Sequence, residues 1–164
     1  MWYKSLYYIY VVNFNNHHLK KMKIKKVFLA SDHAGFLLKD VIIKFLKRRK
    51  INILDLGPKE KNSVDYPDFA HLLAKKMNKQ KNNIGILICG SGEGMIMAAN
   101  KHKNIRAALC YDIKSTKLSR MHNNANVIAI GSRLTKKNVA LRCVDTFLKT
   151  KFEGGRHLRR VKKI

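Results

Sequence analysis

The stretch IGILICGSGEGMIMAANK, residues 84–101, decides the fold of this chain. It opens with a short apolar run that ends at Cys89, and residues 95–102 are compatible with a helix. Between these two segments, glycines stand at alternate positions, Gly90, Gly92 and Gly94. A buried strand, a glycine loop and a helix in this order form a cradle for an anion, because backbone N–H groups and the helix dipole point at one spot. With a cysteine at its edge, the cradle indicates chemistry on a phosphorylated small molecule.

The spacing of these glycines does not match two common phosphate-binding motifs. A dinucleotide fingerprint needs the pattern G-x-G-x-x-G, and Met95 stands where its third glycine would be. The P-loop pattern that ends in Gly-Lys-Ser/Thr is absent as well. A plain strand-to-helix turn is the alternative interpretation of the glycine cluster.

From Met22 onward, apolar strands alternate with helices that have one apolar face. Strands are predicted over residues 26–31, 51–56, 84–89, 105–111 and 127–130. Helices are predicted over residues 36–49, from Tyr66-Pro67 onward, and over 95–102, 114–122 and 135–149, the last capped by Thr135. This alternation is typical of a parallel sheet with helices on both faces. We therefore predict one α/β domain over residues 22–150, a three-layer Rossmann-like sandwich with a five-stranded parallel sheet of order 2-1-3-4-5.

Helical periodicity predicts which residues the first two helices bury. On the first helix these are Leu37, Leu38, Val41, Ile42, Phe45 and Leu46. On the second helix they are Phe69, Leu72, Leu73 and Met77.

In folds of this class, ligands bind beyond the carboxyl ends of the strands, where the strand order reverses. The first and third strands are neighbours there in the predicted order. The first ends in Ser31-Asp32-His33 and the third in Cys89-Gly90. An acid, an imidazole, a thiol and a glycine loop are therefore expected to converge in one small site.

The charge of the chain is strongly positive. Among its 164 residues, 35 Lys and Arg face 10 Asp and Glu, a formal net charge of +25. Such a surplus suits nucleic acid or an anionic membrane. The basic residues are scattered, however, and no zinc-finger spacing or aromatic-rich RNA-binding signature accompanies them. We interpret the charge mainly as a compositional bias that still attracts phosphorylated substrates, with a nucleic-acid-binding protein as the less favoured alternative.

Three cysteines, Cys89, Cys110 and Cys143, form no C-x-x-C pair. An odd number without such a pair argues against a disulfide framework or a zinc site and favours a reducing compartment such as the cytoplasm. Cys110 and Cys143 fall on apolar faces, where a buried thiol is the ordinary interpretation.

The first 21 residues differ from the rest of the chain. They are rich in aromatic residues, and their apolar run, residues 6–12, is too short to span a bilayer. No small-residue cleavage site follows this run. We expect an extension that is disordered or lies upstream of a functional start at Met22, with an organelle transit peptide as the alternative.

Six segments of the sequence match a known family in order. The chain from residue 22 to residue 164 resembles the sugar-phosphate isomerases, the family that includes ribose-5-phosphate isomerase B and the galactose-6-phosphate isomerase subunits. The matching segments are SDHAGFLLK (31–39), DYPDFA (65–70), GILICGSGEGMIMAANK (85–101), IRAALC (105–110), SRMHNNANVIAIGSR (119–133) and EGGRHLRRV (153–161).

The resemblance implies an aldose–ketose isomerase that acts through an enediol, in the non-oxidative pentose phosphate pathway, with no cofactor and no metal. A base moves a proton between two sugar carbons, and donors stabilise charge on the adjacent oxygens. By resemblance, Cys89 is this base, Ser91 hydrogen-bonds its thiolate, His122 protonates the ring oxygen to open the furanose, and Asp32 accepts a hydroxyl proton or orients the sugar. The positions that bind the sugar are His33, Tyr66, Gly90, Gly92, Glu93, Gly94 and Asn123.

Phosphate recognition falls, by the same resemblance, to His33, Arg133, Arg156 and Arg160. Arg156 and Arg160 share one face if the tail is helical, and two guanidinium groups there could bind a phosphate together. The resemblance also implies that the tail, residues 151–164, packs on a partner subunit, so that sites form at the interface of a homodimer or tetramer.

The family resemblance and the charge of the chain leave three alternatives open. The substrate could be a six-carbon sugar phosphate, such as galactose 6-phosphate or allose 6-phosphate. The chain could be a non-catalytic subunit, although the joint presence of Cys89, His122 and both tail arginines argues against this. A nucleic-acid-binding role rests on charge alone, so neither nucleic acid nor a membrane is expected as a partner.

Overall fold

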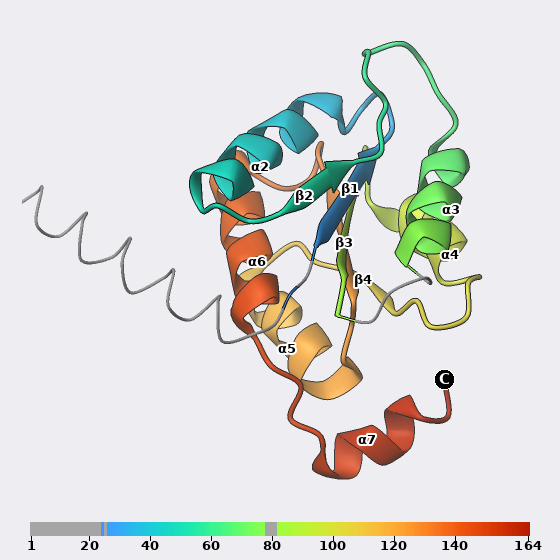
Figure 1. Cartoon of the computed structure of the whole chain (residues 1–164), viewed down its shortest axis with the longest axis vertical. Coiled ribbons are helices and arrows are strands. Elements are labelled where there is room, and N and C mark those ends of the chain that lie inside the picture. Colours follow the sequence, from blue (N-terminus) through green and yellow to red (C-terminus); the bar gives the residue numbers. More distant parts are fainter. Residues whose placement is uncertain (1–23, 25, 78–81) are drawn as a thin grey trace, which may run out of the picture.

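The computed structural model describes residues 24, 26–77 and 82–164; the predicted extension over residues 1–21 lies outside this part. Five strands form one parallel sheet: β1 (Val27–Ser31), β2 (Ile53–Asp55), β3 (Ile84–Cys89), β4 (Ala107–Leu109) and β5 (Val127–Gly131). Six described helices accompany the sheet: α2 (Phe36–Arg48), α3 (Tyr66–Met77), α4 (Glu93–Ala99), α5 (Ile113–Asn123), α6 (Lys137–Lys149) and α7 (Gly155–Val161). The predicted α/β class, with its five parallel strands, is confirmed (Figure 1).

The order of the last two strands differs from the prediction. The sheet runs β2-β1-β3-β5-β4, whereas the sequence suggested 2-1-3-4-5. Burial explains the exchange. All five residues of β5 are buried, and it lies between β3 and β4, while the three residues of β4 are only partly buried, as suits an edge strand. β1 and β3 are neighbours as predicted, and β5 adds a third strand end beside them.

The helices cover both faces of the sheet. One face packs against α2 and α6, with Ile42 and Phe147 in its core, and the other packs against α3 and α4, with Leu73 and Met95. Successive residues of β3 alternate between the two cores, and Cys89 belongs to the core beneath α3 and α4. None of the helices in the described part of the chain has the length and apolar character of a transmembrane helix.

The burial of α2 differs from the predicted face at two positions. Leu37 was expected to be buried but is 62% exposed, whereas Lys39 is buried. The Lys39 ammonium donates to Asp55 Oδ1 at 2.7 Å and to the Pro58 carbonyl at 2.7 Å. A lysine tolerates such burial only when it is paired, and this pair joins α2 to the end of β2. On α3, Leu72 is similarly more exposed than predicted, at 37%.

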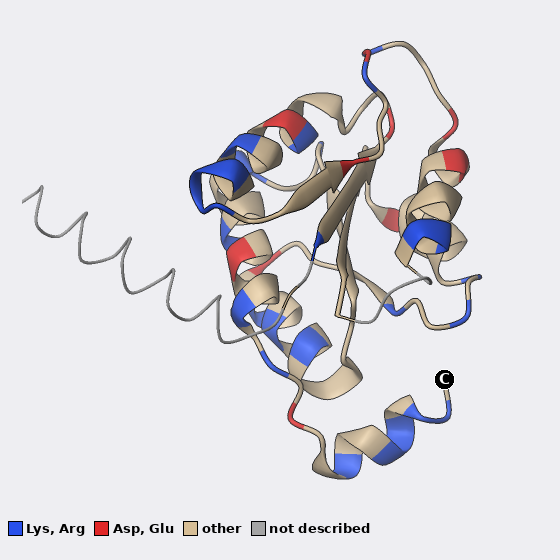
Figure 2. Cartoon of the chain, viewed as in Figure 1, with Lys and Arg blue, Asp and Glu red and all other residues tan. Residues whose placement is uncertain are grey.

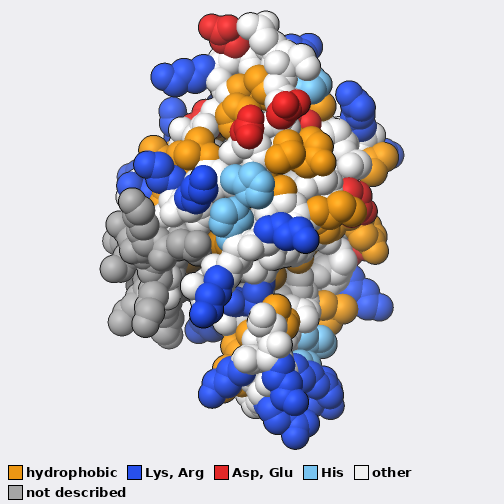
Figure 3. All heavy atoms as spheres, turned by 90° about the vertical axis from the view of Figure 1, so that its right-hand side faces the viewer, with side chains coloured by type: hydrophobic (Ala, Val, Ile, Leu, Met, Phe, Trp, Pro, Cys, Tyr) orange, Lys and Arg blue, Asp and Glu red, His pale blue; other side chains and the backbone are white. Residues whose placement is uncertain are grey.

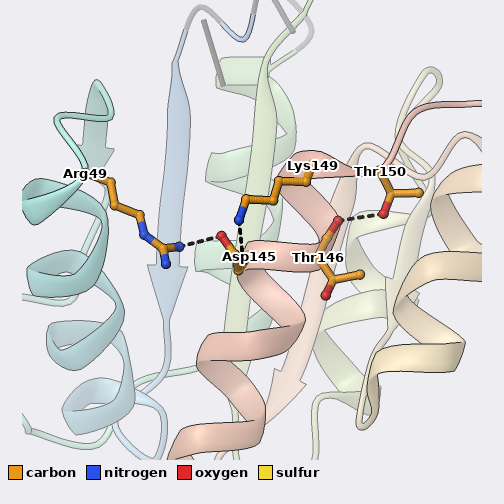
Figure 4. Close-up of polar contacts among 5 residues, drawn as sticks. All are labelled: Arg49, Asp145, Thr146, Lys149 and Thr150. Carbon is orange, nitrogen blue, oxygen red and sulfur yellow. Dashed lines mark hydrogen bonds and ion pairs between the residues drawn. The ribbon is translucent and has the colours of Figure 1, made fainter. Parts of the chain in front are cut away.

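The other end of α2 is joined to α6 by charged side chains. Arg49, at the end of α2, donates to Asp145 at 2.5 Å, and Lys149 donates to the same carboxylate at 2.8 Å (Figure 4). The predicted cap of α6 by Thr135 is wrong: the N-cap is Lys136, and no side chain caps it. Thr135 belongs instead to the turn after β5, where its N–H donates to the Gly131 carbonyl.

We predict that Asp55→Ala lowers the free energy of unfolding by about 2 kcal/mol. Breaking a buried ion pair costs about 3–5 kcal/mol because one charge stays buried, and the partial exposure of Asp55 reduces that cost. Lys39→Met removes the buried charge itself and is expected to cost less than Asp55→Ala. Urea unfolding of both variants measures the order, and a larger loss in Lys39→Met would contradict this account.

Candidate functional site

Cys89 ends β3 at the point where the glycine loop begins. Its side chain is 4% exposed, and its sulfur accepts a hydrogen bond from the Gly92 N–H at 3.0 Å. Gly92 has a φ of +89°, and a Cβ at this position would lie 2.4 Å from Leu109 Cδ1. Only glycine suits this conformation, and it aims the N–H at the sulfur. An N–H donor at a sulfur stabilises the thiolate, which is the nucleophilic and basic form of cysteine.

An open pocket of about 270 Å³ lies above the sulfur. It contains much of the site predicted from the sequence. Its lining residues are Asp32, Tyr66, Cys89, Gly90, Ser91, Gly94, Arg133 and Leu134. They come from the ends of β1, β3 and β5 and from the starts of α3 and α4, which meet because the strands are parallel.

The wall beside Cys89 is made by the turn that follows β1. The Asp32 N–H donates to the Ile88 carbonyl at 3.1 Å, and Asp32 Oδ1 accepts from the Gly35 N–H at 2.8 Å. Ser132, just after β5, donates from Oγ to the Ala34 carbonyl at 2.9 Å. These bonds fix the Asp32 carboxylate on a rigid turn at the pocket.

Two further side chains face the glycine loop. The Tyr66 ring packs so closely on Gly94 that a Cβ there would lie 2.6 Å from it. The Arg133 guanidinium lies over Gly90, with Cζ 3.4 Å from the position of a Cβ. The Arg133 N–H donates to the Gly90 carbonyl at 3.0 Å, which ties the residues after β5 to the loop. A cationic group and a phenol therefore border the space next to the thiol.

Three other predicted site residues, Ser91, Glu93 and His33, differ in their positions. Ser91 is exposed, and its hydroxyl oxygen accepts from the Glu93 N–H at 3.3 Å. Glu93 is the first residue of α4 and is exposed. His33 does not line the pocket, and its Nδ1 accepts from the Val64 N–H at 3.3 Å. The imidazole of His33 thus holds the segment that leads into α3.

His122 lies in a separate cluster near the end of α5. Its ring is stacked on His157 of α7, with centroids 4.2 Å apart and planes 4° from parallel. Glu153 Oε2 lies 3.7 Å from His122 Nε2 and 3.6 Å from His157 Nε2. The Glu153 N–H also donates to the Met121 carbonyl at 3.1 Å, so the tail is fastened to α5 of its own chain.

The burial of His157 has an electrostatic consequence. The pKa of His157 is lowered below its ordinary value, mainly because its ring loses contact with water. The nearby His122 and Arg156 lower this pKa further, whereas Glu153 acts in the opposite direction.

The two clusters lie at opposite edges of the sheet. Cys89 is at the carboxyl end of β3, whereas α5 returns from the carboxyl edge and ends where the strands begin. Figure 1 shows α7 beyond that amino edge. Asn123, Arg156 and Arg160 are exposed there. One chain therefore brings Cys89 together with Asp32 and Arg133, but it does not bring His122, Asn123 and the tail arginines to the same pocket.

Sequence reasoning missed three residues of these clusters. Leu134 lines the pocket, and Glu153 and His157 contact His122. A signal existed for the last two, because they belong to the segment EGGRHLRRV and stand four residues apart. For Leu134, an apolar residue after a strand, the sequence contains no comparable signal.

Comparison with known proteins gives consistent matches. The family model described as Ribose/Galactose Isomerase matches residues 27–164. A probable ribose-5-phosphate isomerase B of Mycoplasma pneumoniae is 49% identical over 139 residues, covering 84% of this chain and 91% of the relative. Ribose-5-phosphate isomerase B of Escherichia coli is 41% identical over 141 residues, covering 86% of this chain and 95% of the relative.

A solved structure agrees with these matches. Ribose-5-phosphate isomerase B from Mycoplasma genitalium with bound ribulose-5-phosphate superposes with a TM-score of 0.82 at 47% identity, covering 84% of this chain and 92% of that chain.

We predict that iodoacetamide modifies Cys89 before Cys110 and Cys143. Burial raises the pKa of Cys110 to about 11 and also raises the pKa of Cys143. At pH 8, roughly 0.1% of Cys110 is then thiolate, and this fraction grows only as the pH approaches 11. Peptide mapping by mass spectrometry measures the order, and equal modification of Cys110 and Cys89 at pH 8 in folded protein would contradict it.

Proposed function

The chain belongs to the ribose/galactose isomerase family, and we propose that it interconverts ribose 5-phosphate and ribulose 5-phosphate through an enediol. The observation that carries this proposal is the pocket in which the Cys89 sulfur, the Asp32 carboxylate and the Arg133 guanidinium meet. The relatives' names supply the substrate class, and the pocket supplies the groups that such a reaction needs. The reaction belongs to the non-oxidative pentose phosphate pathway.

In this proposal, the Cys89 thiolate moves the proton between C1 and C2 of the sugar. The Gly92 N–H donates to its sulfur at 3.0 Å, and the Arg133 guanidinium lies over the same loop, so both groups interact favourably with negative charge at this position during the transfer. Ser91 assists the thiolate from the same loop. As the enediolate forms, charge develops on the two sugar oxygens. Backbone N–H groups of the loop from residue 90 to residue 94 stabilise it, apart from those of Gly92 and Glu93, which donate to Cys89 and Ser91.

The other residues of the pocket bind and orient the sugar. Asp32, fixed on its turn, accepts a hydroxyl proton or holds the hydroxyl in place, and Tyr66 covers the loop at Gly94. Arg133 binds the phosphate together with His33, whose ring is positioned by the Val64 N–H. Glu93 is a sugar contact and not the base, because it is exposed at the start of α4, whereas the Cys89 sulfur lies in the pocket wall.

The acid that opens the furanose ring comes from a second subunit in this proposal. His122, Asn123, Arg156 and Arg160 lie at the amino edge of the sheet, remote from their own chain's Cys89. A homodimer that sets the amino edge of one subunit against the carboxyl edge of the other completes two equal sites. His122 then protonates the ring oxygen, and Arg156 and Arg160 complete the phosphate site.

We place this dimer in the cytoplasm. All three cysteines are free thiols, as a reducing compartment requires.

We predict that Cys89→Ala lowers kcat by at least about 100-fold, as expected for the loss of a general base. The side chain is small and the change removes one sulfur, so the melting temperature should stay nearly unchanged. Turnover of ribose 5-phosphate and thermal unfolding measure the two effects. Near-normal turnover would exclude Cys89 as the base.

The substrate preference is a separate question. Assays of the unchanged chain with galactose 6-phosphate and allose 6-phosphate, beside ribose 5-phosphate, define it.

We predict that two inactive variants restore activity when they are mixed. Cys89→Ala lacks the base, and Arg156→Ala/Arg160→Ala lacks the tail cations. If sites are shared, refolding an equal mixture gives about half heterodimers with one intact site each, and about a quarter of wild-type activity.

Each variant refolded alone is the control for this mixture. The same mixing of Cys89→Ala with His122→Asn tests whether the acid also crosses the interface. Absence of activity in heterodimers verified by mass spectrometry would place these groups in the site of their own subunit.

A further inference from the structure

Three potential metal ligands converge at the His122 cluster. His122, Glu153 and His157 each offer one ligand atom, and these atoms lie within 4.8 Å of one another. They come from three parts of the chain, namely α5, the segment before α7, and α7 itself. Two imidazole nitrogens and one carboxylate oxygen are the donor set of many catalytic and regulatory zinc sites, which leave a fourth position open.

We propose that this trio binds a transition-metal dication of the zinc class and that the bound metal inhibits the enzyme. The separations are close to what coordination requires. Ligands at about 2.1 Å from a tetrahedral Zn²⁺ lie about 3.4 Å from each other. The carboxylate oxygen lies 3.7 Å from His122 Nε2 and 3.6 Å from His157 Nε2, so each nitrogen is within a few tenths of an ångström of that spacing from the carboxylate.

One rearrangement is required. The two imidazole rings are stacked 4.2 Å apart and within 4° of parallel, so their Nε2 lone pairs lie in separate parallel planes and cannot meet at one ion. The rings must splay. The His157 side chain is only 10% exposed and is held in place, whereas the His122 side chain is 37% exposed and can turn about its χ2 bond. Metal binding therefore unstacks His122 from His157.

The neighbourhood restricts which metals bind. Arg156 and Arg160 belong to the same helix as His157 and repel any dication, which weakens the site as a whole. Mg²⁺ and Ca²⁺ prefer oxygen ligands and gain little from imidazole. Zn²⁺, Ni²⁺ and Cu²⁺ bind imidazole strongly enough to offset the repulsion. The site therefore favours metals that prefer imidazole ligands over metals that prefer oxygen ligands.

Inhibition rests on the proposed function, in which His122 donates a proton to the ring oxygen. A metal that occupies Nε2 of His122 removes this donor and holds the ring away from the substrate. The metal has no part in the isomerisation itself. Its binding also joins α7 to α5 more firmly, because both elements then share one ion.

Calorimetric titration of the full chain with ZnCl₂ tests the site without reference to activity. One Zn²⁺ per subunit should bind to the unchanged protein, whereas MgCl₂ should give no heat. Glu153→Gln and His157→Asn should each weaken binding by at least about tenfold, since even partners outside the coordination shell contribute that much. Glu153→Gln keeps the shape of the side chain, so it decides the result if His157→Asn unfolds.

Two control variants test whether Zn²⁺ binds at another place on the protein. His71 and His102 form another pair, with His71 Nδ1 and His102 Nε2 2.7 Å apart, so His71→Asn removes an imidazole remote from α7. Cys89→Ser removes the thiol that could also bind zinc. Both variants should bind Zn²⁺ as the unchanged protein does. Binding that is equal in Glu153→Gln, His157→Asn and the unchanged protein, or no binding at all, would overturn the proposed site.

A second measurement tests inhibition. Zn²⁺ should inhibit turnover of ribose 5-phosphate at concentrations near its dissociation constant, EDTA should reverse this, and Glu153→Gln should be inhibited at least about tenfold less. Zinc that binds at the trio without affecting turnover would overturn the inhibitory role. A chain with no isomerase activity would refute the proposed function, while the titration would still decide whether the metal site exists.

Discussion

The parallel direction of β1, β3 and β5 is the constraint on which the rest of the structure depends. Their register pairs Ser31 with Ile88 and Cys89 with Gly131, so the three carboxyl ends lie side by side. A thiol, a carboxylate and the residues around Arg133 reach one pocket because each follows a strand end. The same parallel direction forces every connecting helix to return to the opposite edge before the next strand can begin.

This return path separates the two groups of residues to which the proposed function assigns the reaction. His122 stands near the end of α5, so a chain with parallel strands cannot bring it to its own Cys89. The tail adds to the same edge, since Glu153 bonds to the Met121 carbonyl and α7 packs His157 on His122. In the proposed dimer, the acid and the tail arginines therefore reach the partner's pocket as one preformed unit. Dimerisation then assembles the site and does not merely stabilise it.

Much of the fold followed from local patterns in the sequence. β3 begins and ends where the apolar run predicted, and the neighbours β1 and β3 were predicted from the strand order typical of such folds. The exchange of β4 and β5 was not predictable, because both are short apolar segments and only their packing separates interior from edge. The burial of Lys39 was hidden for a similar reason. Its partners, Asp55 and the Pro58 carbonyl, lie on another element, and helical periodicity does not describe contacts between elements.

The positive charge follows the architecture as well as the composition. Basic residues occupy the last turns of α2, α3, α5, α6 and α7, where they interact favourably with the helix dipole, and acidic residues occupy the first turns of α3 and α4. Figure 2 shows Lys and Arg at these helix ends, with Asp and Glu also present in α6 and just before α7, and Figure 3 shows Lys and Arg side chains gathered at the end formed by α7.

The basic end at α7 bears on how a phosphorylated sugar enters the proposed dimer. Charges act within a screening length of about 8 Å at physiological salt, so the arginine-rich end attracts the phosphate before the sugar reaches the pocket. With the phosphate held on α7 and Arg133, the far end of the sugar, which carries C1 and C2, is left to meet Cys89. Residues that stabilise the helix ends would in this way also set the direction in which the substrate binds.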